Sequence, residues 1–189
     1  MNEVQNDLSE DKTGHFLPVL IPTAAVLLRR TQTAMGLLHD VVQESLAEYW
    51  YERSKKWRTE GVDASIFFCT YAIEANSNHY RALNMRGFLK YSISRCYEAI
   101  FDFDQAIEIA PDYINSYIMR GKSKYIIEDY QGALQDFNRV IELDPLGTMH
   151  MIHETYFDRQ DVKVKLGDIT GAKIDQGKAR ELCGLPRLP

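Results

Sequence analysis

Residues 80–113 read YRALNMRGFLKYSISRCYEAIFDFDQAIEIAPDY, and residues 114–147 read INSYIMRGKSKYIIEDYQGALQDFNRVIELDPLG. The two segments align without a gap, so that Gly87 matches Gly121 and Phe103 matches Phe137, each 34 positions apart. A period of this length is typical of stacked repeats, in which one short unit cannot bury its apolar face without a neighbour. The aligned stretch therefore predicts a repeat array.

Each segment predicts two helices separated by a polar turn. The turn contains Ser94-Arg95 in the first segment and Glu128-Asp129 in the second. Pro111 and Pro145 predict the end of the second helix in each segment, because proline lacks an amide proton and clashes with the preceding turn. The fold class that follows is all-α.

The repeat continues in weaker form on both sides of the aligned stretch. Ala72 precedes Ala106 by 34 positions, which predicts a degenerate repeat with a helix over 62–75. The turn and helix start recur near Ala172 at an offset of 39, so five extra residues fall within 146–152, as a loop or an extra helical turn. We expect about three to four helix-turn-helix repeats within residues 46–186, at about 46–79, 80–113, 114–147 and 153–186.

The two ends of the array lead to different expectations. No polar capping helix follows the last repeat in this sequence, which predicts apolar surface there, available as an oligomer contact. At the other end, apolar residues spaced by 3, 4 and 7 between Thr31 and Thr59 predict one long helix or two nearly continuous ones. We interpret residues 31–45 as an N-terminal helix that leads into the repeats.

Residues 1–30 are interpreted as a flexible acidic tail followed by an apolar arm. The arm, residues 16–28, reads FLPVLIPTAAVLL, which is too short to span a membrane and is interrupted by Pro18 and Pro22. A secretory signal has basic residues ahead of its apolar stretch, whereas the residues ahead of this arm are acidic. Two interpretations stay open, an arm packed in extended form on the protein's own surface or an exposed patch for a partner, and a membrane-surface anchor is a third.

Charge and cysteine content exclude several classes of protein. The net charge of -5, without a concentrated basic surface, argues against nucleic-acid binding. The three cysteines lie far apart without a Cys-x-x-Cys pair, which predicts free thiols in a reducing compartment and hence a cytoplasmic location. We expect no integral membrane insertion and no cofactor.

The pattern of small residues, Phe, Ala and Pro at this period resembles the tetratricopeptide repeat family. The resemblance implies an α-α right-handed superhelix with an N-terminal extension. The first repeat lacks the glycine and proline, and the fourth has Gln160 where a small residue is usual. The matching residues are Gly87, Ala99, Phe103, Ala106 and Pro111, then Gly121, Tyr130, Ala133, Phe137 and Pro145, then Gly167, Ala172 and Ala179.

An Arg–Asp pair recurs with a separation of 16 residues in three of the repeats. A charge pair at a fixed register is a structural strut between two helices rather than three active sites. The predicted struts are Arg86–Asp102, Arg120–Asp136 and Arg159–Asp175.

The resemblance also implies a concave groove, lined by the first helix of each repeat, that binds a peptide or helix. Aromatic anchors with a few polar groups are typical of binding hot spots. The Lys, Asn and Arg clamp by which some members grip the C-terminus of heat-shock chaperones is missing, which disfavours chaperone-tail binding. The predicted groove residues are Trp50, Trp57, Asn84, Phe88, Tyr91, Ile118, Lys122, Tyr125, Phe157 and Asp161.

No phosphate-binding loop, nucleophile elbow or His-Glu-x-x-His stretch occurs, so we expect no enzyme. His150, His153 and Glu154 form the one cluster with metal-ligand character, and we predict no metal there because no second ligand group accompanies it. The sequence favours a non-catalytic adaptor that binds a partner segment in the groove. The alternative is a self-associating module whose groove is occupied by residues 16–28 or by a second copy of the chain, as a homo-oligomer.

Overall fold

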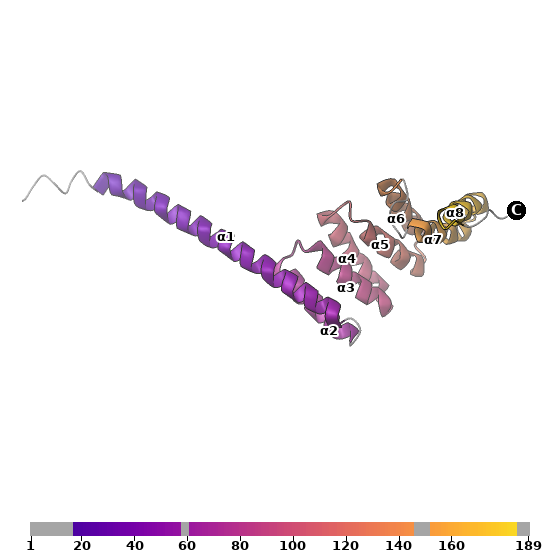
Figure 1. Ribbon diagram of the computed structural model, residues 1–189, viewed down its shortest axis with the longest axis horizontal. Helices are drawn as coiled ribbons and strands as arrows, with labels where there is room; N and C mark the ends of the chain where they lie inside the picture. Colours follow the sequence, from indigo (N-terminus) through magenta and orange to yellow (C-terminus); the bar gives the residue numbers. More distant parts are fainter. Residues whose placement is uncertain (1–16, 58–60, 146–151, 185–189) are drawn as a thin grey trace, which may run out of the picture. The chain divides into compact units, whose positions relative to one another are not determined.

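The computed structural model describes residues 17–57, 61–145 and 152–184. Within these ranges the chain is helical throughout and contains no strand, which confirms the all-α prediction (Figure 1). The helices are α1 Leu17–Trp57, α2 Val62–Ala75, α3 Tyr80–Ser92, α4 Cys96–Ile109, α5 Ile114–Ile126, α6 Tyr130–Leu143, α7 Ile152–Lys165 and α8 Ile169–Leu182.

The chain forms two compact units, Met1–Ser45 and Leu46–Pro189, and α1 contributes residues to both. The helix expected from Thr31 begins at Leu17, so the extended arm is wrong for residues 17–28. Pro18 lies in the first turn, where amide groups have no intrahelical acceptor. The alanines and leucines that follow Pro22 favour helix, and this propensity outweighs one missing hydrogen bond.

In the first unit, the described side chains of α1 include a group of exposed apolar residues. They are between 46% and 71% exposed. This helix face has no cover among the described residues of the unit. The group consists of Met35, Leu37, Leu38, Val41 and Val42.

In the second unit, consecutive helices pack in chain order from α2 to α8, as Figure 1 shows. The bounds of α2 are those predicted, and α4 and α6 each end two residues before Pro111 and Pro145. The first helices of neighbouring repeats also touch, α3 with α5 and α5 with α7. One side of the array is therefore built from first helices. The insertion predicted at 146–152 falls almost wholly outside the described residues.

The turn inside each repeat has the same backbone geometry. Ser94, Glu128 and Gly167 occupy matching positions with φ of 63°, 66° and 81°. The amide after each of them donates to the carbonyl of Lys90, Lys124 or Lys163, at 2.9 Å in all three repeats. Of these three positions, only the one between α7 and α8 is a glycine, Gly167, which adopts a left-handed conformation without a steric cost.

Close packing of a glycine against a phenylalanine joins the two helices of each inner repeat. A Cβ atom on Gly87 would lie 2.7 Å from the Phe103 ring, and one on Gly121 would lie 2.9 Å from the Phe137 ring. Both phenylalanines are almost fully buried. The glycines are required because the rings fill the space that a methyl group would take.

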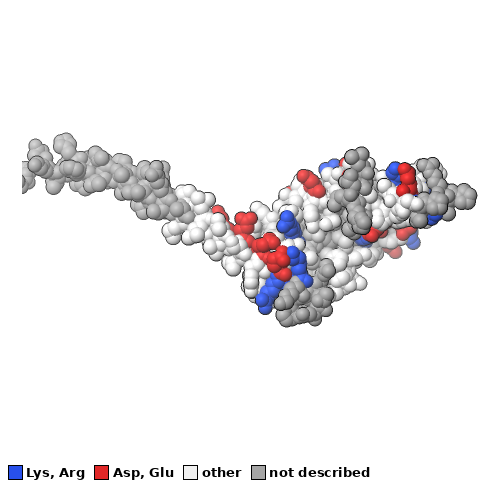
Figure 2. Space-filling model, in the orientation of Figure 1, with Lys and Arg blue, Asp and Glu red and all other residues white. Residues whose placement is uncertain are grey.

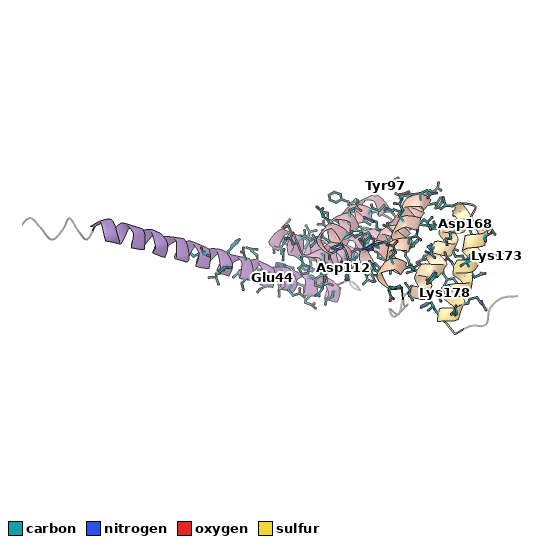
Figure 3. All side chains as sticks on the ribbon, turned by 90° about the horizontal axis from the view of Figure 1, so that it is seen from above. Glu44, Tyr97, Asp112, Asp168, Lys173 and Lys178 are labelled. Atoms are coloured by element: carbon teal, nitrogen blue, oxygen red, sulfur yellow. The ribbon has the colours of Figure 1, made fainter. Side chains whose placement is uncertain are left out.

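The outer face of α8 differs from the apolar end expected from the sequence. The residues of α4 and α6 that face the following repeat include Ile107, Leu134 and Ile141, which pack on neighbouring core clusters. The matching positions of α8 hold Lys173 and Arg180, and Lys173 projects from this helix in Figure 3. Since α8 presents polar groups where α6 presents apolar ones, its stacking face is already suited to water. Ile174 is the most exposed apolar residue of α8. It occupies a different repeat position, the one that Phe67 holds in α2 and Phe101 holds in α4.

Candidate functional site

Three buried charge clusters repeat along the array. In each repeat an arginine binds an aspartate with two hydrogen bonds: Nε to Oδ2 at 2.8–3.0 Å and Nη2 to Oδ1 at 2.5–2.7 Å. A lysine one turn after the arginine lies 2.8–2.9 Å from the same carboxylate. The predicted struts are formed, each with an added lysine. They are Arg86–Lys90–Asp102, Arg120–Lys124–Asp136 and Arg159–Lys163–Asp175.

Each arginine also reaches the second helix of the preceding repeat. Arg86 Nη1 donates to Thr70, Arg120 Nη1 to Asp104 and Arg159 Nη1 to Asn138. Burial lowers the pKa of Arg120, but hydrogen bonds and charge from Asp136 and Asp104 outweigh this, so its pKa is raised. The strut therefore joins helices both within and between repeats. The arginine and the lysine of each cluster share one aspartate and hold the helices together, as expected for the predicted strut.

A cavity of about 300 Å³ opens among the first helices of the last three repeats. Its walls come from α3, α5 and α7, with the buried Phe137 of α6 at its base. Its size suits one large side chain of a partner. The lining residues are Tyr91, Lys122, Tyr125, Ile126, Phe137, Asp158 and Asp161.

The polar part of this cavity centres on Asp158. The Lys122 ammonium lies 3.2 Å from Oδ2 of Asp158, and both side chains are about three-quarters buried (26% and 29% exposed). This contact lacks hydrogen-bond geometry, and no other donor among the described residues reaches that buried oxygen. Burial raises the pKa of Asp158, Lys122 opposes the shift, and the charges of Glu154 and Asp161 add to it. The carboxylate is thus partly desolvated and short of donors.

Comparison with known proteins places this arrangement in a known fold. No protein-family model matches the sequence, and no curated protein matches it. Solved structures do match. The first TPR of Spaghetti (RPAP3), bound to the HSP90 peptide SRMEEVD, superposes with a TM-score of 0.61 at 20% identity, over 66% of this chain and 95% of that one.

The MamA protein gives a TM-score of 0.67 at 18% identity, over 74% of each chain. The TPR2B domain of yeast Sti1, in its pHsp70 complex, gives 0.61 at 19% identity, over 64% of this chain and 98% of that one. At sequence identities of 18–20%, the structural similarity establishes the fold alone.

The chain has a tetratricopeptide repeat fold. Four of the predicted groove residues line the cavity of this fold: Tyr91, Lys122, Tyr125 and Asp161. They come from three successive first helices, as the repeat alignment predicts.

Three other predicted groove residues are engaged in packing. Trp50 stacks on Phe68 of α2, with ring centroids 5.7 Å apart. The Asn84 amide donates to Ser116 at 3.0 Å, a bond between α3 and α5. Ile118 is 4% exposed within a core cluster. These residues hold the tetratricopeptide repeats together, and we leave them out of the candidate site.

The remaining predicted residues lie beside the cavity or outside the described part. Phe88 and Phe157 are half-buried on α3 and α7 and do not line the cavity. Trp57 is the last residue of α1, and its side chain is outside the described residues.

Asp158 is the residue that sequence reasoning missed. It occupies the repeat position of Met85 and Met119, so a carboxylate replaces two apolar side chains in the last repeat. That replacement was the available signal. The same offset of 39 that aligns Arg159 with Arg120 places Asp158 opposite Met119.

The described residues also bear on metal binding and on membrane insertion. No group of three His, Cys, Asp or Glu side chains there can hold a metal ion, and His150 of the predicted cluster lies outside those residues. None of the described helices combines the length and the hydropathy that crossing a membrane requires. On the face drawn in Figure 2, basic and acidic side chains are interspersed.

Proposed function

We propose that this chain is a non-catalytic adaptor that binds a peptide or helix of a partner protein in the groove lined by α3, α5 and α7. The observation that carries the proposal is the cavity, which brings Tyr91 and Tyr125 together with charged groups on one face of the array. Large aromatic side chains beside a few polar groups are typical of hot spots. Two similar structures carry partner ligands in their names, an HSP90 peptide and pHsp70, which supports a role in protein interaction.

The chemistry of the groove argues against a tail as acidic as SRMEEVD. Glu154, Asp158 and Asp161 follow one another on α7 at intervals of four and three residues, so they share a helix face. Like charges placed against one another cost binding energy. The partner segment is therefore apolar or basic rather than acidic.

The proposal is tested by affinity capture with a matched pair of variants. The double variant Tyr91→Ala/Tyr125→Ala removes both aromatic walls. Tyr97→Ala removes a tyrosine of α4 that is 74% exposed and does not line the cavity; it is labelled in Figure 3. We expect proteins captured by the wild type to be retained by Tyr97→Ala and lost by the double variant, with unchanged helical circular dichroism. An identical set from all three proteins contradicts the proposal.

Self-association is the second candidate, and the exposed apolar residues of α1 favour it. Met35, Leu38 and Val42 are at least 46% exposed in the first unit, and such a face gains free energy when covered. In this version the groove is occupied by residues 16–28 or by a second copy.

Light scattering separates this second candidate from the first. A stable dimer of the full chain that becomes monomeric in Leu38→Glu/Val42→Glu supports self-association. A monomeric full chain, whose binding of an apolar dye is unchanged by deletion of residues 1–30, contradicts it.

A cytoplasmic location remains part of the proposal. Cys69 and Cys96 are buried free thiols and Cys183 is an exposed one, a pattern suited to a reducing compartment.

A further inference from the structure

The acidic side of the groove suggests what enters the cavity. Three carboxylates, Glu154, Asp158 and Asp161, stand along one face of α7, and two of them line the cavity. Lys122 is the one basic residue among the lining residues. Two aspartates against one ammonium leave an excess of negative charge among the lining residues. Asp158 is the more buried of the two aspartates, and charges interact more strongly there than in bulk solvent.

Asp158 has capacity left for a second cation. A carboxylate accepts up to about four hydrogen bonds, whereas the Lys122 ammonium lies 3.2 Å from Oδ2 without hydrogen-bond geometry. A guanidinium or ammonium group from a partner would add donors and a positive charge beside this carboxylate. It would also relieve the repulsion between Asp158 and the two neighbouring carboxylates of α7.

The aromatic walls favour the same kind of group. Tyr91 and Tyr125 line the cavity together with the two aspartates. Ring faces attract a cation, and the attraction grows when water is partly excluded. The aliphatic stem of a lysine or arginine would pack against Ile126 and Phe137 while its charged end reaches the aspartates.

The other basic side chains of α3, α5 and α7 do not line the cavity, and among them the arginine and lysine of each strut bind the strut aspartate. Arg81 is exposed on the first turn of α3 and donates to the Tyr80 hydroxyl, while Lys165 is exposed at the last residue of α7. Neither contributes to the cavity wall. The excess of negative charge is therefore confined to the part of the cavity formed by α5 and α7.

We propose that the cavity receives one lysine or arginine side chain of the partner segment, held between the two tyrosines and the two aspartates. This inference rests on the proposed adaptor function. The occupant is a basic, partly apolar protein segment.

Selection from a library of random dodecapeptides tests the inference. Peptides are selected on the full wild-type chain, on Asp158→Asn/Asp161→Asn and on Tyr91→Ala/Tyr125→Ala. The control, Glu108→Gln/Asp112→Asn, removes the same number of charges at exposed positions of α4 and the turn after it, and Asp112 is labelled in Figure 3. We expect wild type and control to enrich peptides with lysine or arginine at one position, and the other two variants to lose that enrichment.

A titration with the most enriched peptide measures the coupling. Replacing its basic residue by glutamine should weaken binding to the wild type and the control about tenfold, the effect of one partly buried charge pair. On Asp158→Asn/Asp161→Asn the two peptides should bind equally. Circular dichroism of each variant shows that the loss is not due to unfolding.

The possible outcomes distinguish a failure of the cationic occupant from a failure of the proposed adaptor function. Enrichment of acidic or uncharged peptides that depends on Tyr91 and Tyr125 overturns the cationic occupant and leaves the adaptor standing. Basic peptides enriched equally by all four proteins reflect attraction to the net charge of -5, and also overturn it. Enrichment by none of the proteins, or of peptides indifferent to the tyrosines, overturns the adaptor function itself.

Discussion

The inner repeats, α3–α4 and α5–α6, and the last repeat, α7–α8, share a charge strut but not a core. All three contain the arginine, lysine and aspartate cluster with nearly the same distances. The inner repeats add the glycine–phenylalanine contact. At the matching positions the last repeat has Gln160 and Gln176, and Oε1 of Gln160 is buried without a partner among the described residues.

This difference shows which interactions depend on a following repeat. Phe137 packs on Val162 of α7 as well as beside Gly121, so its burial needs a next helix. Asp104 and Asn138 bind the arginine of the next repeat, and their counterpart in α8 is Gly177. The Arg–Lys–Asp cluster lies between the two helices of one repeat, and its extra arginine bond reaches back to the preceding repeat. The cluster therefore needs no following repeat and is kept in α7–α8.

The largest expected effect is the loss of a core ring. Phe137→Ala should destabilise the fold by about 3–5 kcal/mol because it empties a fully packed site. Gln176→Ala, at the matching position of the last repeat, should cost about 0.5 kcal/mol or less. Urea unfolding followed by circular dichroism measures both. Equal losses would mean that the last repeat has a core of the same kind.

Removal of the strut aspartate should have a similar cost in every repeat. Asp102→Ala, Asp136→Ala and Asp175→Ala each leave buried cations without their partner, at about 3 kcal/mol or more. Asp104→Ala, which removes a 52% exposed carboxylate, is the control and should cost under about 1 kcal/mol. If Asp175→Ala lowered the stability much less than Asp102→Ala and Asp136→Ala, the last repeat would not rely on its strut.

Addition of a methyl group should have opposite signs in the two kinds of repeat. Gly121→Ala places a Cβ atom 2.9 Å from the Phe137 ring, and such overpacking costs about 1–3 kcal/mol. Gly177→Ala meets nothing within 4 Å inside α8 and should stabilise by about 0.5–1 kcal/mol, since alanine favours helix. Thermal unfolding gives both shifts. Destabilisation by Gly177→Ala would refute the open outer face of α8.

The smallest effect is a pH dependence in the last repeat, where Asp158 occupies the position of Met85 and Met119. Its pKa is raised in the folded chain by burial and by Glu154 and Asp161, against Lys122. The folded state therefore holds more protons than the unfolded state between the ordinary and the raised pKa, and stability falls as pH rises through that window.

The variant Asp158→Asn removes this titration. Its stability relative to wild type should rise as pH increases from below the ordinary aspartate range to neutral. Asp112→Asn is the control and should keep the wild-type profile. A pH-independent difference for Asp158→Asn would refute the desolvated carboxylate.

Much of the fold could be predicted because its determinants recur in the sequence. The period of 34 indicated stacking, the prolines located the ends of α4 and α6, and the spacing of Arg86 and Asp102 indicated a strut. The start of α1 at Leu17 was missed because two prolines were given more weight than the helix propensity around them.

The candidate site depended much more on tertiary structure. Tyr91, Lys122, Tyr125 and Asp161 were predicted individually, but their meeting in one cavity depends on how α3, α5 and α7 pack side by side. The same packing buried Ile118 and drew Asn84 into a bond with Ser116. A repeat pattern specifies local helices and contacts between neighbours. The curvature of the stack decides which groove residues stay open, because burial depends on three helices at once.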